Sequence, residues 1–268
     1  MGKFPINYNL NYGNYFNFFF LQNMVQLNLT RTPIIIVNNI KFSYENKTIL
    51  QGISFNLKAG ERVALLGKTG AGKSTLLNNL IGLKFPQKGE IIIDGLKLDD
   101  KNINLIRKNI GFAFQNPEDQ LFMPTILEDV MFGLLNYKIP PKEAKEKARF
   151  LLDKFGLIEY ENRSSHELSG GQKRLATLAS ILALEPSILI LDEPTNGLDP
   201  SWRKKLAEIL VNLPIKVILI ASHDLNWIKK TTNRAFILDQ GQIQVDQPIT
   251  SLFQQESVLE SYGLPLDW

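Results

Sequence analysis

Residues 67–74 combine glycines, a lysine and a serine at a spacing that suits the binding of phosphate groups. The pattern G-x-x-x-x-G-K-[ST] of a phosphate-binding loop is matched by Gly67-Lys68-Thr69-Gly70-Ala71-Gly72-Lys73-Ser74. Glycines let the backbone curve around phosphates, so that its N–H groups and the next helix N-terminus face negative charge. We expect Lys73 to reach the β- and γ-phosphates of a nucleotide and Ser74 to bind Mg²⁺. The alternative, a chance glycine turn, is disfavoured by the strand and helix expected on either side.

An apolar segment, Ile188–Leu191, leads directly into the acidic pair Asp192 and Glu193. A carboxylate at the end of a buried strand can hold Mg²⁺, and a second one, one residue later, can polarise an attacking water. A buried strand that ends in surface acids is the alternative interpretation of this pattern alone. Together with the phosphate-binding loop, the pair indicates nucleotide hydrolysis.

The hydrophobic pattern predicts an α/β fold that would position these groups on a mainly parallel sheet, with an antiparallel β layer near the start. Strands are expected at Ile34–Val37, Ile40–Tyr44, Ile53–Leu57, Val63–Leu66, Ile91–Ile93, Leu96–Leu98, Ser187–Leu191 and Lys216–Ala221. Helices are expected at Ser74–Leu83, Pro141–Phe155, Ser169–Leu184 and Pro200–Val211. Asp94-Gly95 predicts a hairpin turn, Asp239-Gln240-Gly241 joins a last pair of strands, and Thr125 with Glu128 has capping-box spacing.

The composition excludes several kinds of site. The 268 residues include no cysteine, which rules out disulfides, thiolate metal sites and cysteine nucleophiles. With two histidines, the chain cannot build a multi-histidine metal cage. Its 30 basic and 27 acidic residues leave a net charge of +3, which does not by itself predict nucleic-acid binding, and no nucleic-acid partner is expected. No apolar stretch approaches the ~20 residues of a spanning helix.

A second glycine-rich element, Leu168-Ser169-Gly170-Gly171-Gln172, opens a helix and so forms another anion-binding terminus. The phosphate-binding loop, this LSGGQ turn, Ile188–Glu193, the Asn196-Gly197-Leu198-Asp199 loop and His223 follow one another within Ile34–Ile243. In this order they resemble the nucleotide-binding subunits of ABC ATPases. The resemblance implies a P-loop NTPase fold with an antiparallel β subdomain and a helical insertion at about 115–168. It also implies a head-to-tail dimer, in which the LSGGQ turn of one chain closes over the γ-phosphate held by the other.

The resemblance assigns a role to each remaining candidate. Tyr44 would stack on adenine, although an ordinary strand tyrosine is the alternative, and Thr75 would join the residues that bind ATP. Gln115 would touch Mg²⁺ and link the site to a membrane partner. His223 would contact the γ-phosphate and act with Glu193, whereas Asp199 would communicate across the dimer. His166 lacks such a context and is expected to be a loop residue. One departure concerns the arginine that many relatives carry three positions after LSGGQ, since this chain has Lys173, Arg174 and Leu175.

The stretch Phe114–Thr125, with Glu128–Val130 and Phe132-Gly133, resembles the ATPases of energy-coupling-factor importers, in particular the cobalt and nickel type. That resemblance implies a transmembrane coupling protein and a separate membrane subunit that captures the substrate. The chain would act at the cytoplasmic face of the cell membrane, as two identical copies that never touch the transported substance. Phe122, Met123 and Phe132 would form an apolar groove for the coupling protein, or else the core of the insertion.

Other interpretations stay open at this point. Residues 1–31 form an N-terminal extension, expected to be an unstructured leader, a product of a start placed ahead of Met24, or a partner- or membrane-surface segment. Residues 32–247 are expected to form the ATPase domain and residues 248–268 a short C-terminal extension. The alternative functions are an ABC transporter for vitamins, amino acids, lipids or drugs, a soluble ABC ATPase acting on nucleic acid or ribosomes, and a regulatory nucleotide-binding module.

Overall fold

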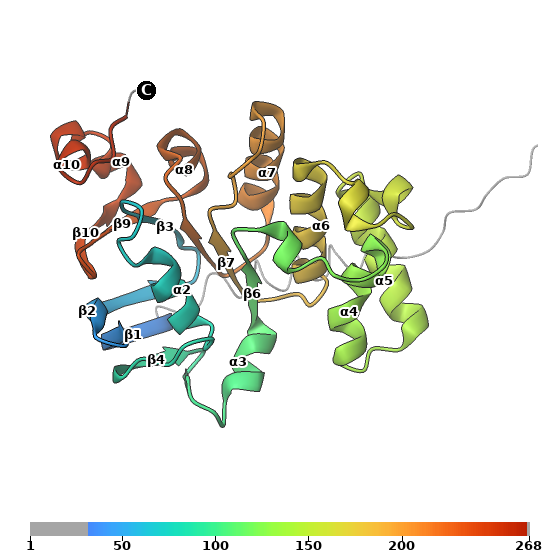
Figure 1. Cartoon of the computed structure of the whole chain (residues 1–268), viewed down its shortest axis with the longest axis horizontal. Coiled ribbons are helices and arrows are strands. Elements are labelled where there is room, and N and C mark those ends of the chain that lie inside the picture. Colours follow the sequence, from blue (N-terminus) through green and yellow to red (C-terminus); the bar gives the residue numbers. More distant parts are fainter. Residues whose placement is uncertain (1–31, 267–268) are drawn as a thin grey trace, which may run out of the picture.

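A six-stranded sheet forms the centre of the molecule (Figure 1). The computed structural model describes residues 32–266, so the proposed leader and Met24 lie outside the described residues. The strands run in the order β10 (Gln242–Pro248), β9 (Arg234–Asp239), β3 (Arg62–Leu66), β8 (Val217–Ala221), β7 (Ile188–Asp192) and β6 (Ile110–Ala113). All neighbours from β9 to β6 are parallel, and β10 pairs antiparallel with β9. The predicted mainly parallel α/β sheet is confirmed.

A four-stranded antiparallel sheet lies beside it, in the order β2 (Lys47–Lys58), β1 (Pro33–Tyr44), β4 (Lys88–Ile93) and β5 (Leu96–Lys97). The two short segments predicted at its start are one strand, β1, with a register shift between Val37 and Ile40. Asn39 within that shift has a φ of 48°, which explains why the hydrophobic alternation is interrupted there. The predicted hairpin turn at Asp94-Gly95 joins β4 to β5.

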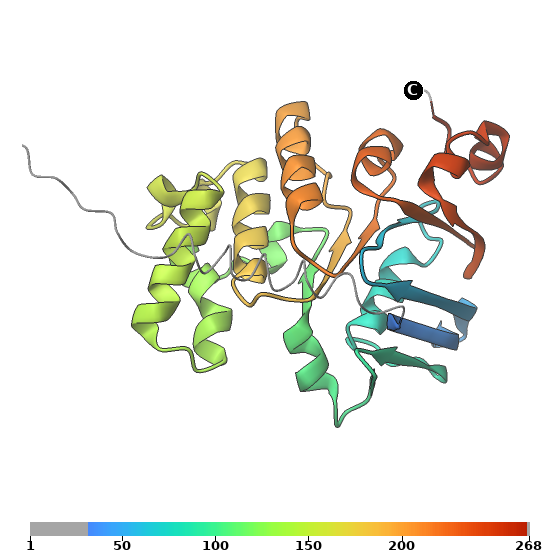
Figure 2. The same ribbon diagram turned by 180° about the vertical axis from the view of Figure 1, so that it is seen from behind.

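Helices cover both faces of the central sheet (Figure 2). They are α2 (Lys73–Leu80), α3 (Ile103–Asn109), α4 (Ile126–Asn136), α5 (Pro141–Lys154), α6 (Gly170–Leu182), α7 (Pro200–Asn212), α8 (Leu225–Thr231), α9 (Ile249–Leu252) and α10 (Glu256–Ser261). The 3₁₀ turns are η1 (Pro117–Asp119), η2 (Ile158–Tyr160) and η3 (Ser165–Glu167), the last of which contains His166. The helix predicted to reach Leu83 ends at Leu80, because the chain turns at Gly82 with a φ of 66°. Among residues 32–266, no helix has the length and apolar character that crossing a bilayer requires.

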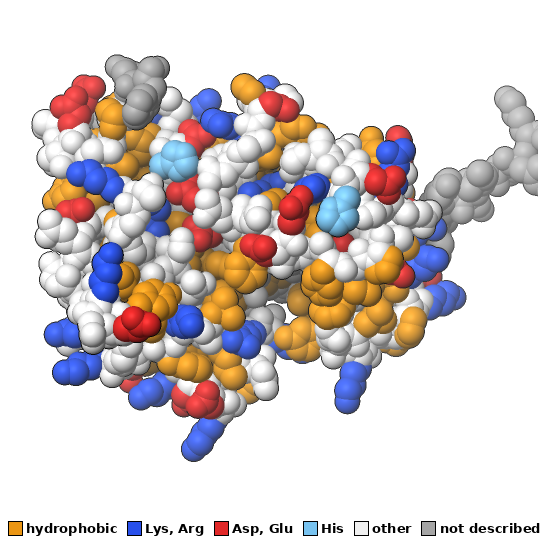
Figure 3. All heavy atoms as spheres, in the orientation of Figure 1, with side chains coloured by type: hydrophobic (Ala, Val, Ile, Leu, Met, Phe, Trp, Pro, Cys, Tyr) orange, Lys and Arg blue, Asp and Glu red, His pale blue; other side chains and the backbone are white. Residues whose placement is uncertain are grey.

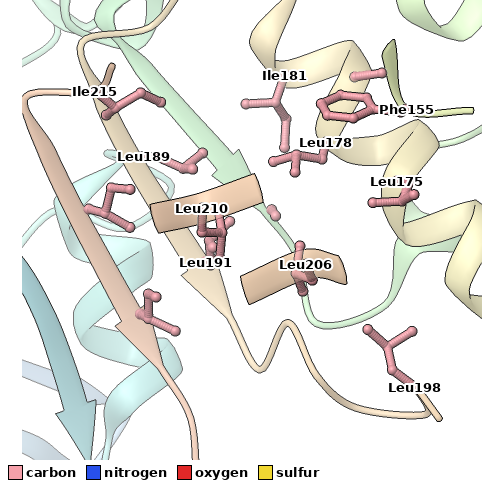
Figure 4. Close-up of a cluster of buried hydrophobic side chains, with 14 of the residues drawn as sticks. Phe155, Leu175, Leu178, Ile181, Leu189, Leu191, Leu198, Leu206, Leu210 and Ile215 are labelled. Atoms are coloured by element: carbon pink, nitrogen blue, oxygen red, sulfur yellow. The ribbon is translucent and has the colours of Figure 1, made fainter. Parts of the chain in front are cut away.

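Side chains of the central strands alternate between two cores. Leu189 and Leu191 of β7 pack with Leu206 and Leu210 of α7 and with residues of α6 (Figure 4). Ile188 and Ile190, which alternate with these leucines along β7, face the opposite core, which contains α2 and the antiparallel sheet. Burial on both faces explains why the strand reads as a continuous apolar run, and it fixes the direction in which the strand end presents its acids.

Arg234 joins the two sheets at one end of β9. Its guanidinium makes two hydrogen bonds of 2.7 Å to the Asp246 carboxylate on β10, and Nη1 lies 3.0 Å from Glu61 Oε1. The same nitrogen donates to the carbonyl of Asn56 on β2, at 2.9 Å. One half-buried arginine thus binds acids and a carbonyl from three separate segments.

Replacing Arg234 by alanine is expected to lower the free energy of unfolding by about 2 kcal/mol, because several charge-assisted hydrogen bonds disappear together. Urea unfolding followed by circular dichroism measures the change. Lys204→Ala is the matched control, since the Lys204 side chain is 80% exposed and its ammonium lies 4.0 Å from Glu208. Equal midpoints for the two variants would contradict the structural role given to Arg234.

Candidate functional site

The phosphate-binding loop lies between β3 and α2, as the sequence predicts. Gly67, Gly70 and Gly72 have φ values of 150°, 83° and 106°, which side-chain-bearing residues rarely adopt. At Gly67, a Cβ would also lie 2.3 Å from the carbonyl oxygen of Leu238. The Lys73 ammonium donates hydrogen bonds to the carbonyls of Gly67, at 2.6 Å, and Lys68, at 3.3 Å. The loop therefore closes around its own lysine. It leads into the N-terminus of α2, where backbone N–H groups are suited to binding anions.

The acids and His223 come to this loop because the strands are parallel. β7 and β3 both neighbour β8, so their carboxyl ends meet at one edge of the sheet. Glu193 follows β7 with a φ of 45°, and its N–H donates to the carbonyl of Ala221 at 2.8 Å. Its carboxylate lies 2.9 Å from His223 Nδ1 and 3.9 Å from Lys73 Nζ. Lys73 and His223, predicted from separate motifs, thus converge on the carboxylate of Glu193, a residue that is only 8% exposed.

Asp192 is buried beside the same loop, and one of its oxygens, Oδ1, has no hydrogen-bond partner among the described residues. Burial raises the pKa of the Asp192 carboxyl above its usual range, although a hydrogen bond from Ser74 opposes that shift. Burial likewise lowers the pKa of the Lys73 ammonium, with Glu193 and Asp192 opposing. A buried, unpaired carboxylate oxygen next to a serine hydroxyl fits Mg²⁺, which prefers oxygen ligands.

Arg174 ties the segment of Gln115 to helix α6. Its Nη1 and Nη2 donate to the carbonyls of Phe114 and Gln115, each at 2.8 Å, and burial lowers its pKa to about 10. The neighbouring Lys173 forms an ion pair with Glu118. The departure noted after the LSGGQ turn therefore has a defined structural result: this arginine contacts backbone carbonyls of the Gln115 segment. Gln115 itself is exposed.

The LSGGQ turn starts α6 with a reciprocal cap. The Ser169 hydroxyl accepts from the N–H of Gln172 at 3.3 Å, and the Gln172 side chain accepts from the N–H of Ser169 at 2.8 Å. Gly170 and Gly171 are the first two residues of the helix. Asp199 caps α7 in a similar way, and hydrogen bonds from Trp202 and Ser201 hold the pKa of its carboxyl below the usual range.

Within one chain, the caps at Ser169 and Asp199 lie away from the phosphate-binding loop. Helix α6 packs on β6, and β7 and β8 separate β6 from β3, which leads into the loop. In both Figure 1 and Figure 2, α7 and β7 lie between α6 and α2. Apart from Tyr44 and Gln115, the predicted residues therefore fall into two groups, one at the sheet edge and one at the starts of α6 and α7.

Tyr44 lies at the end of β1 and is 42% exposed. Its ring packs edge-on against Phe42, with centroids 4.9 Å apart, and Lys84 Nζ lies 6.0 Å from its centroid. One face of an exposed ring is a suitable stacking surface, and its contact with adenine stays a prediction.

Phe122 and Phe132 form an exposed aromatic pair on and before α4, which we call the docking pair. They are 61% and 41% exposed, with centroids 4.9 Å apart and rings nearly perpendicular. The buried Asp129 carboxylate accepts hydrogen bonds of 2.9 Å from the N–H groups of Phe122 and Met123, and so fixes the loop before the helix. Figure 3 shows hydrophobic side chains gathered over α4. The two phenylalanines are therefore at the surface, and the core interpretation does not apply to them.

The C-terminal segment, for which the sequence offers no specific role, reaches the same region as the phosphate-binding loop. A Cβ on Gly263 would lie 2.3 Å from Cε of Lys68. Pro265 and Leu266 line a cavity of about 210 Å³ together with His223 and Asp224. The sequence of residues 248–268 resembles the C-terminal extension of energy-coupling-factor importers, including Gly263-Leu264-Pro265, but that resemblance assigns no role and so did not predict this contact.

Comparison with known proteins shows similarity along most of the chain. The sequence pattern of the family described as "ABC transporter" matches residues 50–196. The energy-coupling factor transporter ATP-binding protein EcfA of Methanothermobacter thermautotrophicus is 40% identical over 238 residues, covering 87% of this chain and 76% of that protein. The structure of cbiO1 from Clostridium perfringens, part of the ABC transporter complex cbiONQ, is 35% identical with a TM-score of 0.75, covering 87% of this chain and 96% of its own. The ATP-binding cassette MJ0796, solved as a dimer with ADP and Pi, is 30% identical with a TM-score of 0.72, covering 80% and 98%.

Replacing Asp192 by asparagine is expected to raise the free energy of unfolding of the nucleotide-free protein at neutral pH by about 1 kcal/mol. Substitutions that remove an unfavourable functional group commonly stabilise a protein by this amount. The reason is that burial of this charge outweighs the attraction of Lys73 and Arg174. Urea unfolding measures it, with the exposed Asp153→Asn as control. A variant less stable than the parent would contradict this account of Asp192.

Proposed function

The chain belongs to the ATP-binding subunits of ABC transporters, and from that premise we propose that it powers an energy-coupling-factor importer of cobalt or nickel ions. As a member of this family, the chain binds and hydrolyses ATP. The observation that carries the proposal is the buried Glu193 carboxylate, held between His223 and Lys73 at the mouth of the phosphate-binding loop. A purely regulatory nucleotide-binding module would be expected to lack such a general base.

In the proposed mechanism, Glu193 accepts a proton from the water that attacks the γ-phosphate. His223 orients the carboxylate through the 2.9 Å contact of Nδ1 with Oε2. Lys73 would leave the loop carbonyls and bind the β- and γ-phosphates, and the N–H groups of the loop, which includes the exposed Thr69 and Gly70, would bind phosphate oxygens. Ser74 and Asp192, which share a hydrogen bond, would hold Mg²⁺ together with Gln115, and the ion would neutralise phosphate charge when bound.

We further propose that two identical chains pair head to tail. The caps at Ser169 and Asp199 belong to helix starts that the chain's own loop does not reach, and helix starts attract anions. A second copy would turn these groups towards the γ-phosphate held by Lys73. The dimer reported for MJ0796 supports this arrangement.

We propose that the transmembrane partner binds at the docking pair, Phe122 and Phe132. An exposed apolar pair on a fixed loop suits a helix from a transmembrane coupling protein. The Gln115 segment, held to α6 by Arg174, follows β6, the strand beside β7, and precedes Phe122 in the chain. The subunit would thus work at the cytoplasmic face of the membrane, and a separate membrane subunit would capture the ion, which never touches this chain.

Two observations support the assignment of cobalt or nickel as the substrate. The segment Phe114–Gly133 resembles the cobalt and nickel type of importer ATPase, and cbiO1 belongs to the complex cbiONQ. The ATPase of another ABC transporter, for example one for a vitamin, is the alternative, because selectivity resides in a different chain.

Glu193→Gln is expected to bind ATP, to form stable dimers in ATP and to lose at least about 100-fold in turnover, as removal of a general base does. Sedimentation measures the dimer and phosphate release measures turnover. Glu159→Gln, an exposed acid in η2, is the matched control and should behave as the parent. Full turnover in Glu193→Gln would show that another group is the base.

Serine at both Phe122 and Phe132 is expected to abolish uptake of radioactive Co²⁺ or Ni²⁺ into vesicles that hold the coupling protein and the substrate-binding subunit. The ATPase activity of the isolated subunit should stay within about twofold, because surface changes usually cost under about 0.5 kcal/mol. Val211→Ser, an equally exposed apolar position on α7, is the control. Vesicles that accumulate a vitamin, an amino acid or a lipid, and no metal, would contradict the substrate assignment.

A further inference from the structure

Gly171, in the first turn of α6, lies directly against the indole of Trp202, in the first turn of α7. A Cβ built on Gly171 would lie 2.4 Å from both Cγ and Cδ2 of that ring and 2.6 Å from Cδ1. Gly171 is buried and is not among the residues with positive φ, so its backbone conformation does not demand glycine. Lack of space is what demands glycine here, because Trp202 occupies the volume that any side chain at position 171 would need.

Trp202 is itself held to the loop before α7. Its backbone N–H donates to Asp199 Oδ1 at 3.0 Å, within the cap of the helix. Lys205 Nζ lies 5.0 Å from the ring centroid and donates to the carbonyl of Phe155 at 3.1 Å. The ring is only partly buried, yet it packs against the core that contains Leu198 and Leu206. A side chain anchored in this way has little freedom to move.

The LSGGQ turn and the 196–199 loop also meet at a second point. A Cβ on Gly170 would lie 3.7 Å from the carbonyl oxygen of Gly197. The backbones of the two segments therefore come close to each other at this point, in addition to the contact through the indole. Both segments belong to the group of caps that the chain's own phosphate-binding loop does not reach.

We propose that Trp202 is a positioning residue that locks the LSGGQ turn to the 196–199 loop, so that one chain presents both to its partner's ATP as a single rigid unit. The proposal rests on the head-to-tail pairing described above. Trp202 does not touch the nucleotide, and it acts by fixing where Ser169 and Asp199 stand relative to each other. A displacement of about 1 Å in such groups can cost on the order of 100-fold.

The next residue, Arg203, connects the same helical turn to the chain's own site. Its Nη1 lies 3.0 Å from Asp224 Oδ2, directly after His223, and its carbonyl accepts from Trp227 Nε1 at 2.9 Å. The first turn of α7 thus contacts the LSGGQ turn on one side and the His223 loop on the other. Through it, the two ATP sites of a dimer would be connected within each chain.

The proposal competes with a simpler explanation of Gly171, that its backbone must approach the partner's γ-phosphate. The two differ in what happens when the indole is removed. If Trp202 is the obstacle, a methyl group at position 171 becomes tolerable once the ring is gone. If the phosphate is the obstacle, the methyl group is equally harmful with or without the ring.

The test measures the ATP concentration at which half the protein is dimeric, in the Glu193→Gln background. We expect Trp202→Ala and Gly171→Ala each to raise this concentration about tenfold, and Gly171→Ala to add less than about twofold when Trp202→Ala is already present. Trp202→Phe, which keeps a ring against Gly171, should stay within about threefold of the parent and should still be sensitive to Gly171→Ala. Lys204→Ala, exposed on the same helix, is the control.

Two further measurements separate positioning from damage to the fold. Titration of a fluorescent ATP analogue into single chains should give the parent's dissociation constant for each variant, and thermal unfolding reports folding. Should Trp202→Ala not fold, Trp202→Leu takes its place, because leucine keeps apolar packing but vacates most of the space that the indole ring occupies against Gly171. Equal penalties for Gly171→Ala with and without the indole, or an unchanged dimer midpoint in Trp202→Ala, would overturn the proposal. A Glu193→Gln protein that never dimerises in ATP would instead overturn the head-to-tail pairing.

Discussion

The carboxylate of Glu193 is the group around which the site is organised. A buried carboxylate needs compensating partners, and here His223 and the Lys73 ammonium provide them from two other segments. The parallel order of β3, β8 and β7 brings those segments to one sheet edge. The left-handed backbone at Glu193, fixed by its hydrogen bond to Ala221, turns the side chain towards them. Such a conformation costs about 1–3 kcal/mol in a non-glycine residue, and the packed sheet around it bears that cost.

The remaining candidate residues are organised by two helix starts away from that edge. Arg174 ties α6 to the Gln115 segment, and Trp202 ties the same helix to α7. In the proposed function, each chain would therefore supply one group of residues for hydrolysis and another, at the starts of α6 and α7, for capping its partner's ATP. The proposed pairing of two chains would explain why every motif is intact in one chain although that chain does not bring them all together.

The sequence was sufficient for the parts of the structure that depend on local pattern. The phosphate-binding loop, the apolar strand before Asp192 and the LSGGQ helix start all have residue spacings that follow from backbone geometry. Helices α3 and α8 were missed because each has seven residues, too few for a clear period. The contact of Trp202 with Gly171 was out of reach for another reason: it joins two helix starts 31 residues apart, and no local signal encodes it. The exposure of the docking pair required the tertiary structure as well, since the sequence left both a surface groove and the core of the insertion open for Phe122 and Phe132.

The contact of Gly263 with Lys68 has a practical consequence for spectroscopy. The tail of the chain rests on the loop that would close around the phosphates, so a dye near this position would report on its environment. Because the natural chain has no cysteine, a single thiol introduced at Tyr262 could be labelled selectively. The C-terminal segment thereby offers an optical reporter of nucleotide occupancy that leaves the hydrolytic residues unaltered.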